Sequence, residues 1–197
     1  IGLLRRLFAE DRVSHDGRFF KVEDLSLEPK PARTPPIYFA ANSEPAARRA
    51  ARMGDGMMAI ERDPVAHYLD ELRKLGRESE AALLGTLPLL VDDDPERAWA
   101  QTKEHWLHQH NEYSRYEYSE NPDDFVPLDD ADVLRGDGTW GGWQPLTPAD
   151  AVSYIRRRTD GLPVEDLHFW AIAPGEPVEA ASRRLEIMAK EVLPALR

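Results

Sequence analysis

The sequence contains no cysteine in its 197 residues. Disulfides, thiolate nucleophiles and cysteine-ligated zinc are therefore excluded for this chain. No apolar run reaches membrane-spanning length and no signal peptide opens the sequence, so we expect a soluble, cytoplasmic protein. Lys and Arg number 25 against 36 Asp and Glu, and this net charge of −11 argues against nucleic acid and anionic membranes as partners.

Several familiar catalytic and phosphate-binding patterns are also missing. No G-x-S-x-G elbow, no P-loop, no H-E-x-x-H and no G-x-G-x-x-G fingerprint occurs. His105, His108 and His110 share one predicted helix, but no carboxylate completes a ligand set, so we expect surface histidines and no metal site. The 42% apolar and 31% charged residues are ordinary values for one globular domain over residues 1–197.

The most informative segment runs from Glu28 to Met57. Its prolines hold the chain extended before a short buried strand, Ile37–Ala41. An alanine-rich helix, Ser43–Met53, follows directly, and a Gly-Asp-Gly turn leads into a second strand, Met57–Ile60. This order predicts a βαβ unit with a parallel pair of strands.

The first turn of that unit, Ala41, Asn42 and Ser43, is the predicted cofactor-binding site. Unpaired N–H groups and the positive end of the helix dipole meet at such a turn and favour a phosphate. The Ser43 hydroxyl would donate to a phosphate oxygen, although serine in this place also serves as a plain helix cap. Glu44 weakens the phosphate interpretation, because a carboxylate repels an anion.

The remaining elements follow from hydrophobic spacing and turn residues. They are a hairpin within His15–Leu27, a helix from Asp63, a strand Leu83–Val91, a helix from Asp94 to about Tyr116, a helix from Thr147, a strand Leu167–Ile172 and a closing helix Glu176–Leu196. His168 would then lie near the start of the last strand, which suggests a structural histidine.

Four strands near 37–41, 56–60, 84–91 and 167–172, each followed by a helix, predict an α/β fold with parallel strands adjacent in that order. Four such units are half of an eight-unit barrel of roughly 250 residues. Half a barrel leaves open sheet edges, so we expect the chain to associate with a missing half, in cis or in another chain, or to form a homo-oligomer.

Polar residues follow two more strands at the same end of the predicted sheet. Glu61 and Arg62 come after the second strand, and Asp92–Asp94 come after the third. An arginine in the place of Arg62 could pair with an anionic ligand, but the simpler interpretation is that Arg62 is solvated and that Asp94 caps the following helix.

Residues 119–145 form a long polar stretch that we predict to be an irregular loop and an active-site lid. Gly136–Trp143 within it combines glycine hinges with two aromatic side chains. A flexible loop or a dimer contact through the tryptophans is the competing interpretation.

Short motifs in a fixed order extend over nearly the whole chain. They are Gly17-Arg18-Phe19-Phe20, Leu27-Glu28-Pro29-Lys30-Pro31, Pro35-Pro36-Ile37, Ala40-Ala41-Asn42-Ser43, Ala50–Gly56, Pro174-Gly175-Glu176-Pro177 and Glu191-Val192-Leu193-Pro194. In this order and spacing the chain resembles the C-terminal half of the luciferase-like flavin monooxygenases.

The resemblance implies a TIM barrel, (β/α)8, of the bacterial luciferase type, of which this chain supplies about the second half. It implies an oxidoreductase or monooxygenase that acts on a small organic substrate with reduced FMN, or by hydride transfer with the deazaflavin coenzyme F420. It also gives Ser43 the phosphate contact, and a flavin reductase becomes a possible partner. Catalytic residues stay unknown, because the family places them in the first four strands. The alternative is a non-catalytic flavin-binding or partner subunit.

Overall fold

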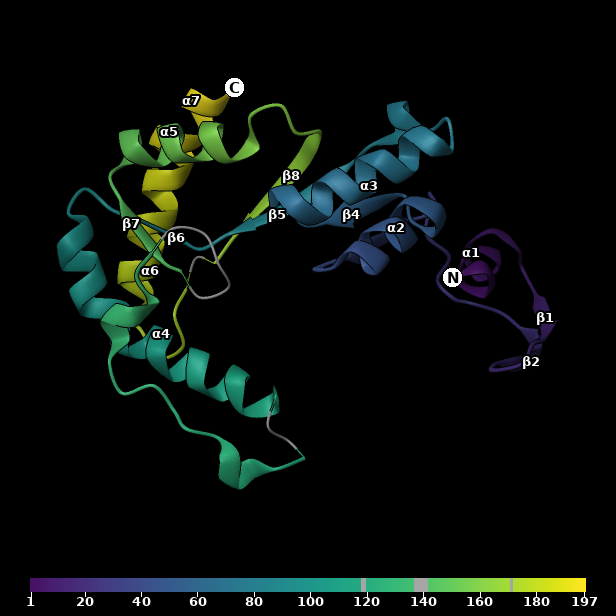
Figure 1. Ribbon diagram of the computed structural model, residues 1–197, viewed down its shortest axis with the longest axis horizontal. Helices are drawn as coiled ribbons and strands as arrows, with labels where there is room; N and C mark the ends of the chain where they lie inside the picture. Colours follow the sequence, from purple (N-terminus) through teal and green to yellow (C-terminus); the bar gives the residue numbers. More distant parts are fainter. Residues whose placement is uncertain (118–119, 137–141, 171) are drawn as a thin grey trace. The chain divides into compact units, whose positions relative to one another are not determined.

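A computed structural model of the chain describes residues 1–117, 120–136, 142–170 and 172–197 (Figure 1). The chain divides into two compact units, Ile1–Leu84 and Gly85–Arg197. The first unit contains α1 (Gly2–Ala9), β1 (Val13–Asp16), β2 (Lys21–Leu25), β3 (Tyr38–Ala40), α2 (Glu44–Met53), β4 (Gly56–Met58), α3 (Arg62–Lys74), a 3₁₀ turn at Glu78–Glu80 and the start of β5 (Leu83–Leu87).

The predicted βαβ unit is confirmed in the first unit. β3 and β4 pair in parallel with Tyr38 opposite Gly56, and β4 pairs in parallel with the start of β5. Ahead of them, β1 and β2 form the predicted antiparallel hairpin, closed by a hydrogen bond of 3.0 Å from Gly17 N–H to the Phe20 carbonyl. Pairing in this order brings the turns that follow β3 and β4 to one edge of the sheet.

Small residues let α2 lie close to these strands. Ala47, Ala50 and Ala51 are fully buried at helical spacing. The Gly-Asp-Gly turn is also tightly packed and has no room for a side chain at either glycine. A Cβ at Gly54 would lie 2.9 Å from the Phe39 ring, and one at Gly56 would lie 2.3 Å from the Tyr38 ring. Both glycines are therefore steric requirements of the fold.

Asp55, between those glycines, fastens the start of β3. Its carboxylate accepts hydrogen bonds from Ile37 N–H at 2.7 Å and from the Arg5 guanidinium at 2.9 Å. Its own N–H donates to the Ile37 carbonyl at 2.9 Å. Burial raises the pKa of Asp55, but the hydrogen bonds from Arg5 and Ile37 outweigh burial and leave the pKa below its ordinary value of 3.8.

We expect Asp55→Asn to destabilise the chain by about 1 kcal/mol at pH 7, the scale of a partly exposed hydrogen bond to a charged group. Because the folded pKa lies below the unfolded one, the contribution of Asp55 is present above about pH 4 and is lost as pH falls through the folded value. Urea unfolding of both proteins from pH 7 to pH 3 measures this, and the difference between them should shrink on acidification. An undiminished difference at pH 3 would contradict the assignment.

The second unit holds the end of β5, followed by β6 (Leu89–Val91), α4 (Pro95–Glu117), 3₁₀ turns at Pro122–Asp124 and Ala131–Leu134, β7 (Gln144–Leu146), α5 (Pro148–Thr159), β8 (Val164–Phe169), α6 (Val178–Ile187), a π-helical segment Met188–Val192 and α7 (Leu193–Leu196). The largest sheet among the described residues has the order β3-β4-β5-β8, which confirms the predicted adjacency of the four strands.

The structure corrects three boundaries. The predicted strand Leu83–Val91 is broken at Pro88, whose carbonyl accepts a hydrogen bond from Gln144 N–H at 3.0 Å, and its second half pairs in parallel with β7 instead. The closing helix is interrupted by the π-helical segment. The last strand begins at Val164 rather than Leu167, so His168 lies near its carboxyl end and is exposed, not near its start.

The prediction of an irregular loop over residues 119–145 is wrong for part of this stretch. It contains the two 3₁₀ turns and the first residues of β7, while residues 137–141 lie outside the described part of the chain. Trp143 is buried and stacks on Trp106 of α4 with ring centroids 3.6 Å apart. Trp143 is therefore a core residue rather than an exposed aromatic side chain, and a lid role for the stretch stays a prediction.

Candidate functional site

The turn between β3 and α2 presents the three predicted site residues in sequence. Ala41 is buried, while Asn42 and Ser43 are exposed at the start of α2. Ser43 occupies the N-cap position with an extended backbone (φ −146°, ψ 157°), and its carbonyl accepts a hydrogen bond from Ala47 N–H at 2.9 Å. Its hydroxyl makes no capping hydrogen bond. Ser43 is therefore the N-cap residue of α2 by position, and a phosphate contact of its exposed hydroxyl stays a prediction.

The first turn of α2 adds backbone donors to this hydroxyl. N–H groups in a first helical turn have no carbonyl partner within the helix, and the helix dipole places about half a positive charge there. Pro45 has no N–H, so Glu44 and Ala46 supply the donors of this turn. With the Ser43 hydroxyl, this donor set has the chemistry of an anion site.

Arg48 offsets the repulsion that Glu44 would exert on an anion. Its guanidinium donates to the Glu44 carboxylate at 2.8 Å, one helical turn away on α2. This hydrogen bond is the largest cause of a lowered pKa at Glu44. Arg48 is held in turn by Asp70 at 3.2 Å and by the buried Glu71 at 3.0 Å, both on α3. Because its carboxylate is already paired with Arg48, Glu44 is compatible with a phosphate bound nearby.

The turn after β4 lies at the same edge of the sheet, since β3 and β4 are parallel with Ala40 opposite Met58. Its polar residues are Glu61 and Arg62, both exposed. The Glu61 carboxylate accepts a hydrogen bond from Ile60 N–H at 3.2 Å, which fixes the backbone of this turn. A ligand contact by Arg62 stays a prediction.

The aspartates after β6 have structural partners. The Asp94 carboxylate accepts a hydrogen bond from Arg97 N–H at 3.0 Å, which confirms the predicted helix cap. Asp92 is buried and binds the Arg97 guanidinium at 2.9 Å, while Asp93 pairs with Arg183 of α6 at 3.0 Å. These carboxylates join α4 to α6.

The three histidines of α4 behave differently from one another. His105 faces the loop after β8, where a Cβ on Gly175 would lie 3.3 Å from its Nδ1. His110 lies 3.3 Å from the Ser114 hydroxyl, and His108 is exposed. In the described part of the chain, no three histidine or carboxylate side chains are grouped as a metal site requires.

Sequence reasoning missed a buried ion pair beyond β8. Arg184 of α6 donates to the Glu176 carboxylate at 2.6 Å, and the two side chains are only 6% and 0% exposed. The same carboxylate accepts a hydrogen bond from Ala173 N–H at 2.6 Å. This pair fixes the loop between β8 and α6. Glu176 lies in the Pro174–Pro177 motif, but nothing in that motif indicates that Arg184, eight residues later, is its partner.

A sequence model of the family described as "Luciferase-like monooxygenase" matches residues 1–154. The chain belongs to the luciferase-like monooxygenase family. None of the helices in the described part of the chain combines the length and apolar character that crossing a membrane requires.

Two relatives within this family show how far the similarity extends. An F420-dependent glucose-6-phosphate dehydrogenase from Intrasporangium calvum is 27% identical over 218 residues, which cover 100% of this chain and 59% of that protein. An F420-dependent hydroxymycolic acid dehydrogenase from Mycobacterium tuberculosis is 41% identical over 63 residues, 32% of this chain and 18% of that protein. The chain thus spans about 59% of the length of the first of these relatives.

Solved structures confirm the fold class. An F420-dependent secondary alcohol dehydrogenase, in complex with an F420-acetone adduct, superposes with a TM-score of 0.66 at 19% identity, covering 98% of this chain and 58% of that one. A monooxygenase from Streptomyces bottropensis gives a TM-score of 0.68 at 19% identity with the same coverage. The chain has the α/β fold of the luciferase-type barrel over that share of its length.

Proposed function

We propose that this chain is part of an oxidoreductase that uses coenzyme F420 and that Ala41, Asn42 and Ser43 bind the phosphate of the cofactor. FMN is the alternative cofactor, and a small organic molecule is the substrate. Family membership supports the reaction class, and the names of the curated relatives favour F420 over FMN. The observation that carries the site is the Ser43 hydroxyl, which stands at a helix N-terminus and makes no capping hydrogen bond.

The residues at this turn fit a phosphate in three respects. The hydroxyl and the first-turn N–H groups supply donors, and Pro45 restricts the backbone that presents them. The neighbouring carboxylate of Glu44 is already paired with Arg48. The chain carries a net charge of −11, so an anionic cofactor depends on such a local positive site.

When bound, a reduced deazaflavin supplies hydride transfer, and the protein supplies position and exclusion of water. The role we assign to this turn is positional. It holds the phosphate end of the cofactor at the carboxyl edge of β3, and the adjacent turn after β4 continues the same edge. Parallel α/β barrels place their ligands at this end of the strands.

We expect Ser43→Ala to weaken the binding of F420 by roughly 5- to 30-fold, or about 1 to 2 kcal/mol, because one charge-assisted hydrogen bond is lost. The deazaflavin chromophore without its phosphate-bearing tail should bind almost equally to both proteins. Titration of the intact protein with both ligands, followed by fluorescence, measures the difference. FMN and riboflavin form the parallel pair for the alternative cofactor.

Ser153→Ala is the matched control, because Ser153 lies on α5 and its hydroxyl donates to the Ala149 carbonyl at 3.1 Å. It should leave both affinities unchanged. Equal losses for the phosphorylated and unphosphorylated ligands in Ser43→Ala would remove the phosphate role. Cofactor binding without turnover of any alcohol, carbonyl or oxygen substrate would instead favour a non-catalytic cofactor-binding protein.

A further inference from the structure

Three aromatic side chains meet near the carboxyl end of β8 while remaining exposed. Trp170 follows the strand directly and is 36% exposed, whereas Tyr113 and Tyr116 of α4 are 47% and 75% exposed. The Tyr113 ring lies 6.3 Å from the Trp170 ring at an interplanar angle of 77°, and 6.5 Å from the Tyr116 ring at 82°. We call these three residues the aromatic corner.

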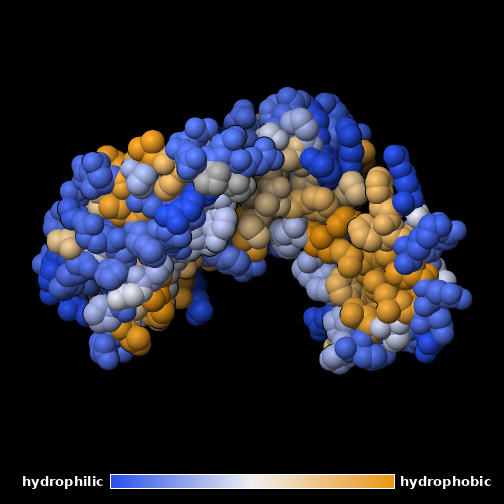
Figure 2. Space-filling view, turned by 90° about the horizontal axis from the view of Figure 1, so that it is seen from below, coloured by the Kyte–Doolittle hydropathy of each residue, from blue (hydrophilic) through white to orange (hydrophobic). Residues whose placement is uncertain are grey.

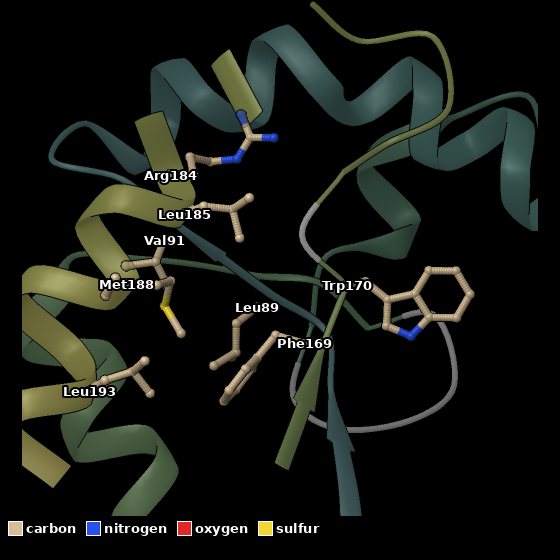
Figure 3. A pocket seen from close by; sticks show the side chains of 9 residues that line it. Leu89, Val91, Phe169, Trp170, Arg184, Leu185, Met188 and Leu193 are labelled. Carbon is tan, nitrogen blue, oxygen red and sulfur yellow. The ribbon is translucent and has the colours of Figure 1, made fainter. Parts of the chain in front are cut away.

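Trp170 belongs both to the aromatic corner and to the lining of an apolar pocket beside α6. Phe169 and Trp170 both line a pocket of about 400 Å³; the Phe169 ring lies close to Leu89, and the Trp170 indole points in a different direction (Figure 3). Phe169 faces the closing helices, whereas Trp170 lines the same pocket and also contacts Tyr113 of α4 while 36% exposed.

The two segments that carry the aromatic corner, the loop after β8 and α4, are both fixed by buried contacts. The loop after Trp170 is fixed by the Glu176 carboxylate, which binds both Ala173 N–H and the Arg184 guanidinium. On the other side, α4 is anchored by Trp106, which is 1% exposed and belongs to the same buried cluster as Ala173. Rings supported in this way lose little freedom when a ligand binds, which favours affinity.

Apolar residues form a broad patch on the right of the view in Figure 2 and are scattered elsewhere, and the scattered ones need no explanation. Three rings in a row, with Tyr113 nearly perpendicular to both of its neighbours, are different. A flat ring laid against one face of the corner would be stacked on one side chain and edge-on to another, and both are preferred geometries for aromatic pairs. A puckered, saturated ring makes neither contact well.

Charge around the corner disfavours an anionic ligand. Arg115 lies between the two tyrosines in sequence, but its guanidinium is 3.3 Å from the Glu112 carboxylate and lies over the Phe125 ring at 5.7 Å. That cation is therefore already paired, and the chain as a whole carries a net charge of −11. An uncharged ligand suits this surface best.

We propose that Trp170, Tyr113 and Tyr116 determine substrate specificity by binding an uncharged, flat aromatic portion of the substrate. This inference rests on the proposed function, because it places the substrate at the carboxyl end of the strands. It adds a substrate class that differs from the sugar phosphate in the name of the Intrasporangium calvum relative.

The test is the binding of two matched probes to the intact protein without cofactor, measured by calorimetry. Acetophenone and cyclohexyl methyl ketone carry the same acetyl group on a flat and on a puckered six-membered ring. Trp170→Ala should weaken acetophenone about 3- to 10-fold, the scale of one aromatic pair, and change cyclohexyl methyl ketone by less than about twofold. Trp170→Phe should retain most of the preference, and Tyr113→Leu should lose part of it.

Val178→Ala is the control, since Val178 is an apolar residue of the same unit, 67% exposed at the start of α6. It should leave both probes unaffected. Equal affinity of wild type for the two ketones, or equal loss of both in Trp170→Ala, overturns the proposal. A change in oligomeric state without a change in probe binding would overturn it too, because the rings would then contact a second copy of the chain.

The two proposals fail separately. Loss of the acetophenone preference in Trp170→Ala, combined with an unchanged F420 affinity in Ser43→Ala, would retain the aromatic corner and remove the phosphate site. The reverse combination would retain the cofactor site and remove the corner. Glucose 6-phosphate serves as a third probe, and tighter binding of this anion than of acetophenone would contradict the assigned substrate class.

Discussion

Replacing Arg184 by methionine is expected to destabilise the chain by about 3 to 5 kcal/mol, because it leaves the buried carboxylate of Glu176 without its cation. The Glu176 side chain has no exposed surface, so water cannot replace the lost partner. The Ala173 N–H would remain as a donor to this carboxylate, but one backbone hydrogen bond does not offset burial of a full charge. Chemical unfolding of wild type and variant at pH 7 measures the loss.

Two further variants separate charge from packing. The double variant Glu176→Gln, Arg184→Met should be more stable than Arg184→Met alone, since it removes the unpaired charge while keeping an acceptor for Ala173 N–H. Arg183→Met is the control, because Arg183 is 48% exposed and pairs with the exposed Asp93 at 3.0 Å, while the buried Asp92, 3.8 Å from Arg183, keeps Arg97 at 2.9 Å. If Arg184→Met were as mild as Arg183→Met, the anchoring role of this ion pair would be wrong.

The same ion pair links stability to the proposed specificity. Glu176 holds Ala173, which lies three residues beyond Trp170 in the loop that follows β8. If this loop becomes more mobile, Trp170 should no longer be held in a fixed position relative to Tyr113. The acetophenone preference is therefore expected to weaken in Arg184→Met under conditions where the variant is still folded, even though Arg184 is not part of the corner.

The sequence was informative where the signals are local. Ser43 before an alanine-rich run predicts the start of α2, and Gly54 predicts its end, because both depend on a few neighbouring residues. The cap at Asp94 follows from the same kind of pattern. The order of the strands could also be predicted, since alternating strands and helices permit few topologies.

Contacts between distant residues were not predictable in the same way. Whether Ser43 uses its hydroxyl as a cap depends on its rotamer, which no sequence pattern fixes. The strand Leu83–Val91 follows from an apolar run, whereas its break at Pro88 depends on pairing with β7, a segment more than 50 residues later. The predicted start of the last strand was three residues late, because the prediction followed the apolar run that begins at Leu167. β8 begins at Val164 and includes the exposed, charged Glu165 and Asp166.

The tryptophans show the same limit. Trp99 and Trp106 lie one heptad apart on α4, a spacing typical of core or interface residues, and both are buried. Their partners come from a segment that lacks regular spacing. Trp99 donates to the Asp132 carboxylate at 2.7 Å, and Trp106 stacks on Trp143, so the stretch after α4 folds back over the helix. Composition alone suggested a loop there.

Removing the Trp106 side chain is expected to cost about 3 to 5 kcal/mol, the usual range for truncating a large buried aromatic residue to alanine. Trp106 is 1% exposed, and its ring lies 3.6 Å from that of Trp143 with an interplanar angle of 26°. Its indole N–H has no hydrogen-bond partner among the described residues, so we expect the loss to come from packing and not from a broken hydrogen bond. Chemical unfolding of Trp106→Ala provides the measurement.

A spectroscopic signal distinguishes the stack from burial in general. Two stacked indoles couple electronically, so wild type should show an exciton feature in circular dichroism that both Trp106→Ala and Trp143→Ala lose while still folded. Trp99→Phe is the control, because it removes an indole of the same helix that bonds to Asp132 instead of stacking. The feature should survive in that variant. A large loss of stability in Trp106→Ala without any change in this signal would mean that Trp143 does not stack on it in solution.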